Sequence, residues 1–195
     1  TLFFNATAVY SYYNYQLGTP VDAEPAFIWD SRIENYVTNA GWTWYPNPAH
    51  TVDFGVQNTA YVFHPGAISG VFSLELQQEY ATEPALYISD DWRITDVFTA
   101  TYGLRYSTFF NLGGRDIQVY RNPHNPIQQE ATGIVPYAPG EIIASYTGLA
   151  GLEPRLALNY QVGARSALKA SYNRSRQYIH LISNNTTATP VNVWR

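Results

Sequence analysis

Apolar and polar residues alternate with a period of two along much of this chain. In "FTATYGLRY" (98–106), every second residue from Phe98 to Tyr106 is apolar or aromatic, and Arg105 lies among the intervening threonine and glycine residues. Because successive side chains of a strand point to opposite faces, the stretch predicts a strand with one apolar and one polar face. Arg105 then faces away from its aromatic neighbours.

The same alternation recurs in six further segments. They are "LFFNATAVYSYY", "VTNAGWTWY", "TVDFGVQNTAYV", "LYISDDW", "LEPRLALNYQ" and "ALKASYNRSRQY". Most of them reach or exceed the roughly 9–11 residues that a tilted strand needs to cross a bilayer. The fold class predicted from this pattern is all-β, with about seven antiparallel strands.

The connections between these segments alternate in length. Short turns are expected near 45–50, 93–97 and 162–166, and long loops near 16–25, 64–83 and 111–151. This alternation is typical of a transmembrane β-barrel, whose periplasmic turns are short and whose outer loops are long. Trp44, Tyr45 and Trp92 lie beside the short turns, where an aromatic girdle meets the membrane interface. Soluble antiparallel sheets also alternate, but the loop pattern favours a barrel.

Composition supports a wall with one lipid-facing side. Only 13% of the residues are charged, against about 25% in average globular chains, while 17 are tyrosine. The absence of cysteine excludes disulfides and thiolate metal sites. A net charge of −4 gives no basic surface for nucleic acid. No apolar run approaches the roughly 20 residues of a spanning helix. The chain has no methionine and no signal peptide at Thr1, so we expect a processed or excised piece.

Two long stretches resemble the barrel of TonB-dependent outer-membrane receptors of the Bacteroidota type. They are "ALYISDDWRITDVFTATYGLRYSTF" and "LEPRLALNYQVGARSALKASYNRSRQYIHLISNN", and "YPNPAHTVDFGVQNTAYVFHPG" resembles the hairpin upstream of them. The resemblance covers most of residues 28–185. It implies a bacterial outer-membrane barrel of about 22 strands, closed by a plug and energised by a TonB complex through the plug and its TonB box. A surface lipoprotein is a further implied partner.

This sequence departs from that family's pattern at both ends. No plug domain or TonB-box segment is visible, and the chain ends in "TPVNVWR" rather than in a strand with a C-terminal aromatic residue. Seven strands would also leave two open edges, which hydrocarbon does not tolerate. Residues 1–195 are therefore predicted to be an internal fragment of the barrel. An eighth strand around Glu141–Tyr146 is an alternative to an outer loop throughout 111–151.

The function that we expect is TonB-energised import of a scarce ligand, which would be an iron chelate, a cobalamin, a glycan or a peptide. One alternative is a soluble, secreted β-sandwich or carbohydrate-binding module, and a second is an outer-membrane scaffold without transport. We expect no enzyme and no cofactor, because no nucleophile elbow is present. The four histidines are scattered, so we expect no metal site. The pair Asp90–Asp91 would bind a cation, or would place one carboxylate in the lumen and the other at the periplasmic rim.

Candidate site residues fall into three groups. Ligand-binding candidates in the long outer segment are Arg115, Asp116, Tyr120, Arg121 and His124. Residues expected to face the lumen are Asp53, Gln57, Arg105, Glu153, Arg155, Asn159, Gln161 and Lys169. Among these we expect ion pairs between Arg105, Glu153 and Arg155.

The third group, Arg174 and Arg176, shares the apolar face by alternation. Arginine at the bilayer midplane costs about 2–4 kcal/mol and close to nothing at the interface. We therefore expect both side chains at the outer rim, in contact with outer-membrane lipid and with the phosphates of lipopolysaccharide, which suit the guanidinium fork. A bulge that swaps the two faces is the alternative.

Overall fold

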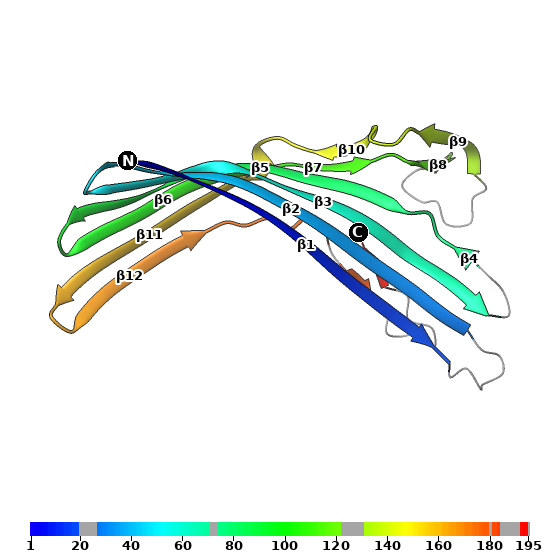
Figure 1. The fold of residues 1–195 in the computed structure, drawn as a ribbon, viewed down its shortest axis with the longest axis horizontal. Coiled ribbons are helices and arrows are strands. Elements are labelled where there is room, and N and C mark those ends of the chain that lie inside the picture. The colour runs from blue at the N-terminus through cyan, green and yellow to red at the C-terminus, as the bar shows by residue number, and fades with distance from the viewer. Residues whose placement is uncertain (20–26, 71–73, 122–130, 180, 184–191, 195) are drawn as a thin grey trace.

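A long antiparallel sheet dominates the structure, which is a computed structural model that describes residues 1–19, 27–70, 74–121, 131–179, 181–183 and 192–194. Seven strands follow one another across the sheet in the order β1-β2-β3-β5-β6-β11-β12, and the sheet arches along its length (Figure 1). These strands are β1 (Leu2–Gly18), β2 (Phe27–Asn47), β3 (His50–Gly70), β5 (Glu79–Thr95), β6 (Phe98–Ser107), β11 (Leu152–Gly163) and β12 (Ser166–Asn173). The all-β fold with antiparallel strands is as predicted.

Seven shorter strands are also described. They are β4 (Leu74–Glu75), β7 (Phe109–Leu112), β8 (Arg115–Tyr120), β9 (Ala131–Tyr137), β10 (Ile142–Tyr146), β13 (Leu181–Ser183) and β14 (Asn192–Trp194). Of these, β4, β7 and β10 join the long sheet, while β8–β9 and β13–β14 form two separate two-stranded sheets. β7 continues β6 and pairs with both β5 and β10, and the 3-10 turn η1 (Leu149–Gly151) leads from β10 into β11. β8 and β9 form a separate hairpin.

The structure thus has strands in much of segment 111–151, where an outer loop is expected. The runs are short, but β10 pairs with β7, and β8 pairs with β9, so each satisfies its backbone groups. Within the described residues, no helix has both the length and the apolar character needed to cross a membrane.

Three tight turns lie at one end of the sheet, at 48–49, 96–97 and 164–165. They are staggered along the strands. The β2–β3 turn closes at the pair Asn47↔His50, and His50 lies opposite Trp92, three residues before the end of β5 at Thr95. Closure of a barrel requires strands to tilt and to stagger in this manner. The sheet is accordingly half of a barrel wall.

The convex face of the sheet is largely apolar, and the concave face is polar apart from a buried apolar cluster of Ile33, Phe63, Ala81 and Phe109. One row of cross-strand partners on the convex face comprises Trp42, Phe54, Ile88 and Leu104. Side chains on this face remain open, with Leu168 67% exposed, whereas Glu153 on the concave face is only 4% exposed. Among the described residues no second sheet covers the apolar face. The soluble sandwich is therefore wrong, because so large an apolar surface requires hydrocarbon or a partner.

The longest strands extend well beyond the apolar band. β2 and β3 contain 21 residues each, or about 70 Å of extended chain, whereas about 9–11 residues suffice to cross a bilayer. On the convex face the band ends at Tyr10 and Tyr36, whose hydroxyls donate to Glu34 Oε2 over 3.3 and 3.0 Å. Beyond Glu34 the convex side chains of β1 and β2 are mostly polar, among them Asn14, Gln16, Asp30 and Arg32, so we expect this part of the wall to stand above the membrane.

On the concave face, the Tyr87 ring lies across two glycines of neighbouring strands, Gly41 and Gly55. A Cβ on Gly55 would lie 2.6 Å from Tyr87 Oη and 2.5 Å from the Ala40 carbonyl oxygen. The Tyr87 hydroxyl donates to Asn39 Oδ1 over 3.3 Å. The glycine pair therefore makes the space in which this ring fits against the wall.

We expect Gly55→Ala to lower the free energy of unfolding by about 1–3 kcal/mol, because the added methyl overpacks the Tyr87 site. Gly163→Ala is the control, since a Cβ there meets nothing within 4 Å, and its effect should stay within about 0.5 kcal/mol. Unfolding in guanidinium, followed by tryptophan fluorescence in detergent micelles, measures both. Equal effects of the two substitutions would contradict this account of Tyr87.

Candidate functional site

A charged cluster on the concave face is centred on Arg105. Its Nη1 donates to Gln57 Oε1 over 2.7 Å, its Nη2 lies 3.4 Å from Glu83 Oε1, and its Nε lies 3.5 Å from Glu153 Oε1. The side chains of Arg105, Glu83 and Glu153 are 17%, 16% and 5% exposed. Because one guanidinium faces two carboxylates, the cluster carries a net charge of −1.

Neighbouring hydrogen bonds fix both carboxylates. Tyr61 donates its hydroxyl to Glu83 Oε2 over 3.1 Å, and Ser107 Oγ donates to Glu153 Oε1 over 2.6 Å. Arg105 and Glu153 lie close together because they are direct cross-strand partners in the register of β6 and β11. Glu83 is not among the predicted lumen residues because it falls in a segment predicted as a long connection, whereas β5 already begins at Glu79.

A short segment after β12 packs against the concave face rather than continuing the wall. We call residues 174–179 the inner strap; in Figure 1 the chain passes beneath the arch here. The Tyr178 ring stacks on Phe109 with centroids 5.5 Å apart, and its hydroxyl donates to the Ser107 carbonyl oxygen over 2.9 Å. Tyr178 and Ile179 pack on a buried cluster that includes Ile33 and Phe109. The strap is thus anchored by both packing and hydrogen bonding.

A pocket of about 430 Å³ opens between the inner strap and the wall. Its lining residues are Tyr13, Ile33, Asn35, Tyr61, Glu83, Arg176, Gln177, Tyr178 and Ile179. The Arg176 guanidinium carbon lies 5.6 Å from the centre of the Tyr178 ring, and Asn35 Oδ1 is a buried atom without a hydrogen-bond partner. We call this the strap pocket. Aromatic walls with a few polar groups are what a small-ligand site requires.

Arg174 and Arg176 take different places. Arg176 lines the strap pocket, while Arg174 Nη2 donates to the Ala150 carbonyl oxygen over 3.4 Å from an exposed position. Alternation put both on the apolar face, but β12 ends at Asn173, so the period-two rule does not extend to them. For Arg176 this position favours a ligand contact over lipopolysaccharide.

The other residues expected in the lumen lie on the same concave face. Asp53 Oδ1 accepts from Thr43 Oγ1 over 2.5 Å, and Asn159 lies directly opposite Lys169. Gln161 Nε2 donates to the Gly163 carbonyl oxygen over 3.4 Å. Arg155 lines a second concave pocket of about 220 Å³ together with Arg105; within the described residues it has no ion pair.

The candidates from the outer segment lie apart from the strap pocket. Arg115 forms an ion pair with Glu79, and Tyr120 donates its hydroxyl to Gln118. Arg115, Asp116 and Tyr120 belong to β8, and Arg121 is exposed directly after this strand. His124 lies outside the described residues. Their role as ligand contacts stays a prediction.

A polar cluster lies on the convex face near the tight turns. Asp90 Oδ2 lies 2.7 Å from His50 Nδ1 and accepts from the Tyr102 hydroxyl over 2.8 Å. The His50 ring stacks on Trp92, with centroids 5.4 Å apart. Asp91 faces the opposite side, where Thr101 donates to it over 2.5 Å. In the described part of the chain, no three His, Cys, Asp or Glu side chains are grouped to hold a metal.

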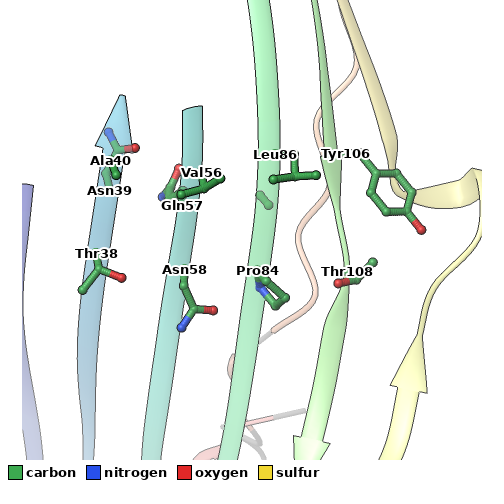
Figure 2. A pocket seen from close by; sticks show the side chains of 11 residues that line it. Thr38, Asn39, Ala40, Val56, Gln57, Asn58, Pro84, Leu86, Tyr106 and Thr108 are labelled. Atoms are coloured by element: carbon green, nitrogen blue, oxygen red, sulfur yellow. The ribbon is translucent and has the colours of Figure 1, made fainter. Parts of the chain in front are cut away.

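A furrow of about 500 Å³ crosses the convex face over β2, β3, β5 and β6. Figure 2 shows its two rows of side chains. The row closer to the tight turns comprises Ala40, Val56, Leu86 and Tyr106, and the next comprises Thr38, Asn58, Pro84 and Thr108. We call this hollow the convex furrow.

A tilted antiparallel wall with an apolar outer face and a charged inner face is typical of a membrane β-barrel protein. A family model described as "Outer membrane beta barrel domain" matches residues 63–193, about two thirds of the chain. The chain therefore belongs to this family of outer-membrane β-barrels, and its location is the bacterial outer membrane. No curated protein and no solved structure matches the chain.

Proposed function

We propose that these residues form part of the wall and the outer vestibule of a TonB-dependent receptor that imports a scarce ligand. The strap pocket supports this proposal, because it sets three tyrosines beside an unpaired amide oxygen, a carboxylate and a guanidinium inside the barrel. No bond is made or broken in this function. The outer vestibule captures the ligand, and a plug that is coupled to a TonB complex then moves to admit it.

The strap supports capture from the outside. It lies on the long-connection side of the Arg105 cluster, and its anchor Tyr178 contacts Ser107 and Phe109 at the junction of β6 and β7. In an outer-membrane barrel the long connections face the exterior. A ligand that enters from the outside would therefore reach the strap pocket before the Arg105 cluster.

An uptake experiment on cells that carry the full-length protein tests the proposal. The probes are radiolabelled ferric citrate, cyanocobalamin, a maltooligosaccharide and a pentapeptide. We expect one of them to accumulate, an uncoupler to abolish its accumulation, and Tyr178→Ala to lower the uptake rate about fivefold or more through loss of packing and hydrogen bonding at the pocket.

The matched control is Tyr172→Ala, which removes a tyrosine that is 59% exposed on the convex face of β12. It should leave uptake unchanged. Heat-dependent electrophoretic migration shows that both variants fold. Accumulation that persists with the uncoupler, or no accumulation of any probe above cells that lack the protein, would refute energised import.

A further inference from the structure

The convex furrow lies in the half of the apolar band that is farther from the tight turns. Trp44, near the β2–β3 turn, and Thr38 in the furrow are separated by about 20 Å of strand. At a tilt of about 40° this is about 15 Å of height in a band about 25 Å tall. Because the long connections face outward, the furrow opens into the outer leaflet.

Larger side chains border the furrow on both sides. Toward the tight turns, Trp42 stacks on Phe54 with ring centroids 5.8 Å apart. Toward the outside, Tyr10 and Tyr36 pack with centroids 5.1 Å apart. Between these rows the convex side chains of β1 and β2 are Ala6, Ala8, Thr38 and Ala40. The furrow is therefore a trough in the lipid-facing surface.

Polar side chains, among them those of Thr108 and Asn58, line the furrow on this otherwise apolar face. Thr108 is 9% exposed, and its side chain lines the furrow. Figure 2 shows the Thr108 oxygen directed toward Pro84 and the hollow. Asn58 Oδ1 accepts from Thr82 over 2.7 Å, which leaves its amide nitrogen to donate into the furrow. A hydroxyl or amide that faces hydrocarbon without a hydrogen-bond partner is costly.

We propose that the convex furrow binds a fatty-acid chain of lipopolysaccharide. The apolar side chains of Val56, Leu86 and Pro84 contact the chain, while Thr108 and Asn58 hydrogen-bond the ester or hydroxyl oxygen at its carbonyl end. Lipopolysaccharide is the source because the furrow faces the outer leaflet, and its fatty acids carry hydroxyl and ester groups close to the sugar. The site is on the opposite face of the wall from the strap pocket and does not depend on the proposed import.

Native mass spectrometry of the full-length protein in mild detergent tests the site. Protein stripped of lipid is incubated with vesicles of phosphatidylethanolamine, with or without lipopolysaccharide. We expect the wild type to retain lipopolysaccharide and not phosphatidylethanolamine. Ala40→Trp fills the furrow and should reduce retention to background, and Thr108→Val should lower the bound fraction about fivefold by removing one hydrogen bond.

Ala170→Trp is the control, because Ala170 lies on the convex face of β12, outside the furrow. It should retain as much lipopolysaccharide as the wild type, and heat-dependent migration verifies folding of each variant. Equal retention by Ala40→Trp and Ala170→Trp would overturn the site. Retention of phosphatidylethanolamine in place of lipopolysaccharide would overturn the choice of lipid.

Discussion

Arginine in place of Ile88 will lower the free energy of unfolding in lipid by about 2–4 kcal/mol, the cost of a guanidinium near the bilayer midplane. Ile88 is 55% exposed on the convex face and lies between Phe54 and Leu104 of the neighbouring strands. Among the described residues, its cross-strand row includes Trp42, Phe54, Leu104 and Pro154, none of which has a polar group that could accept from an arginine side chain. Reversible guanidinium unfolding of the full-length protein in phospholipid vesicles measures the change.

Ala157→Arg is the matched control for that experiment. Ala157 lies on the concave face, where its cross-strand partners are Thr101 and Ser171. An arginine there meets water and polar side chains, so its effect should stay below about 1 kcal/mol. A larger loss for Ala157→Arg than for Ile88→Arg would reverse the assignment of the two faces.

The second large effect is expected at Arg105. Arg105→Met removes the only cation that forms an ion pair with Glu83 and Glu153 among the described side chains and leaves two largely buried carboxylates near each other. We expect a loss of about 2–4 kcal/mol, since an uncompensated buried charge is strongly destabilising. The same unfolding measurement applies.

Two further variants separate the charge effect from lost packing. Arg155→Met removes an arginine of the same face that has no ion pair within the described residues, so the free energy of unfolding should change by less than about 0.5 kcal/mol. Glu153→Gln, added to Arg105→Met, should recover part of the loss because it removes one of the repelling charges. No recovery in the double variant would mean that Arg105 acts through packing alone.

Alternation was sufficient to predict the wall. It put Ile88 and Arg105 on opposite faces because both lie inside long strands, where the period of two is unbroken. The same alternation accounts for Asp90. It is two residues from Ile88 and two from Trp92, and it lies with them on the convex face. The family match and the fold together agree with an outer-membrane barrel.

The strap pocket could not be predicted in the same way. Its formation depends on where β12 ends, and the sequence around Asn173 continues the alternation past the real end of the strand. Tyr178 then reaches Ser107 across 71 positions of the chain. A contact between residues so far apart in the sequence depends on the curvature of the whole sheet. A local pattern of residues does not predict that curvature.

The length of β2 and β3 determines where solutes first meet this protein. About half of each strand extends beyond the hydrocarbon on the outer side of the membrane. Antibodies, phages and proteases that approach the cell would encounter hydrogen-bonded sheet at this height as well as the connections between strands. Recognition of the cell surface through this protein would therefore depend on strand residues, whose spacing is fixed, as well as on the loops.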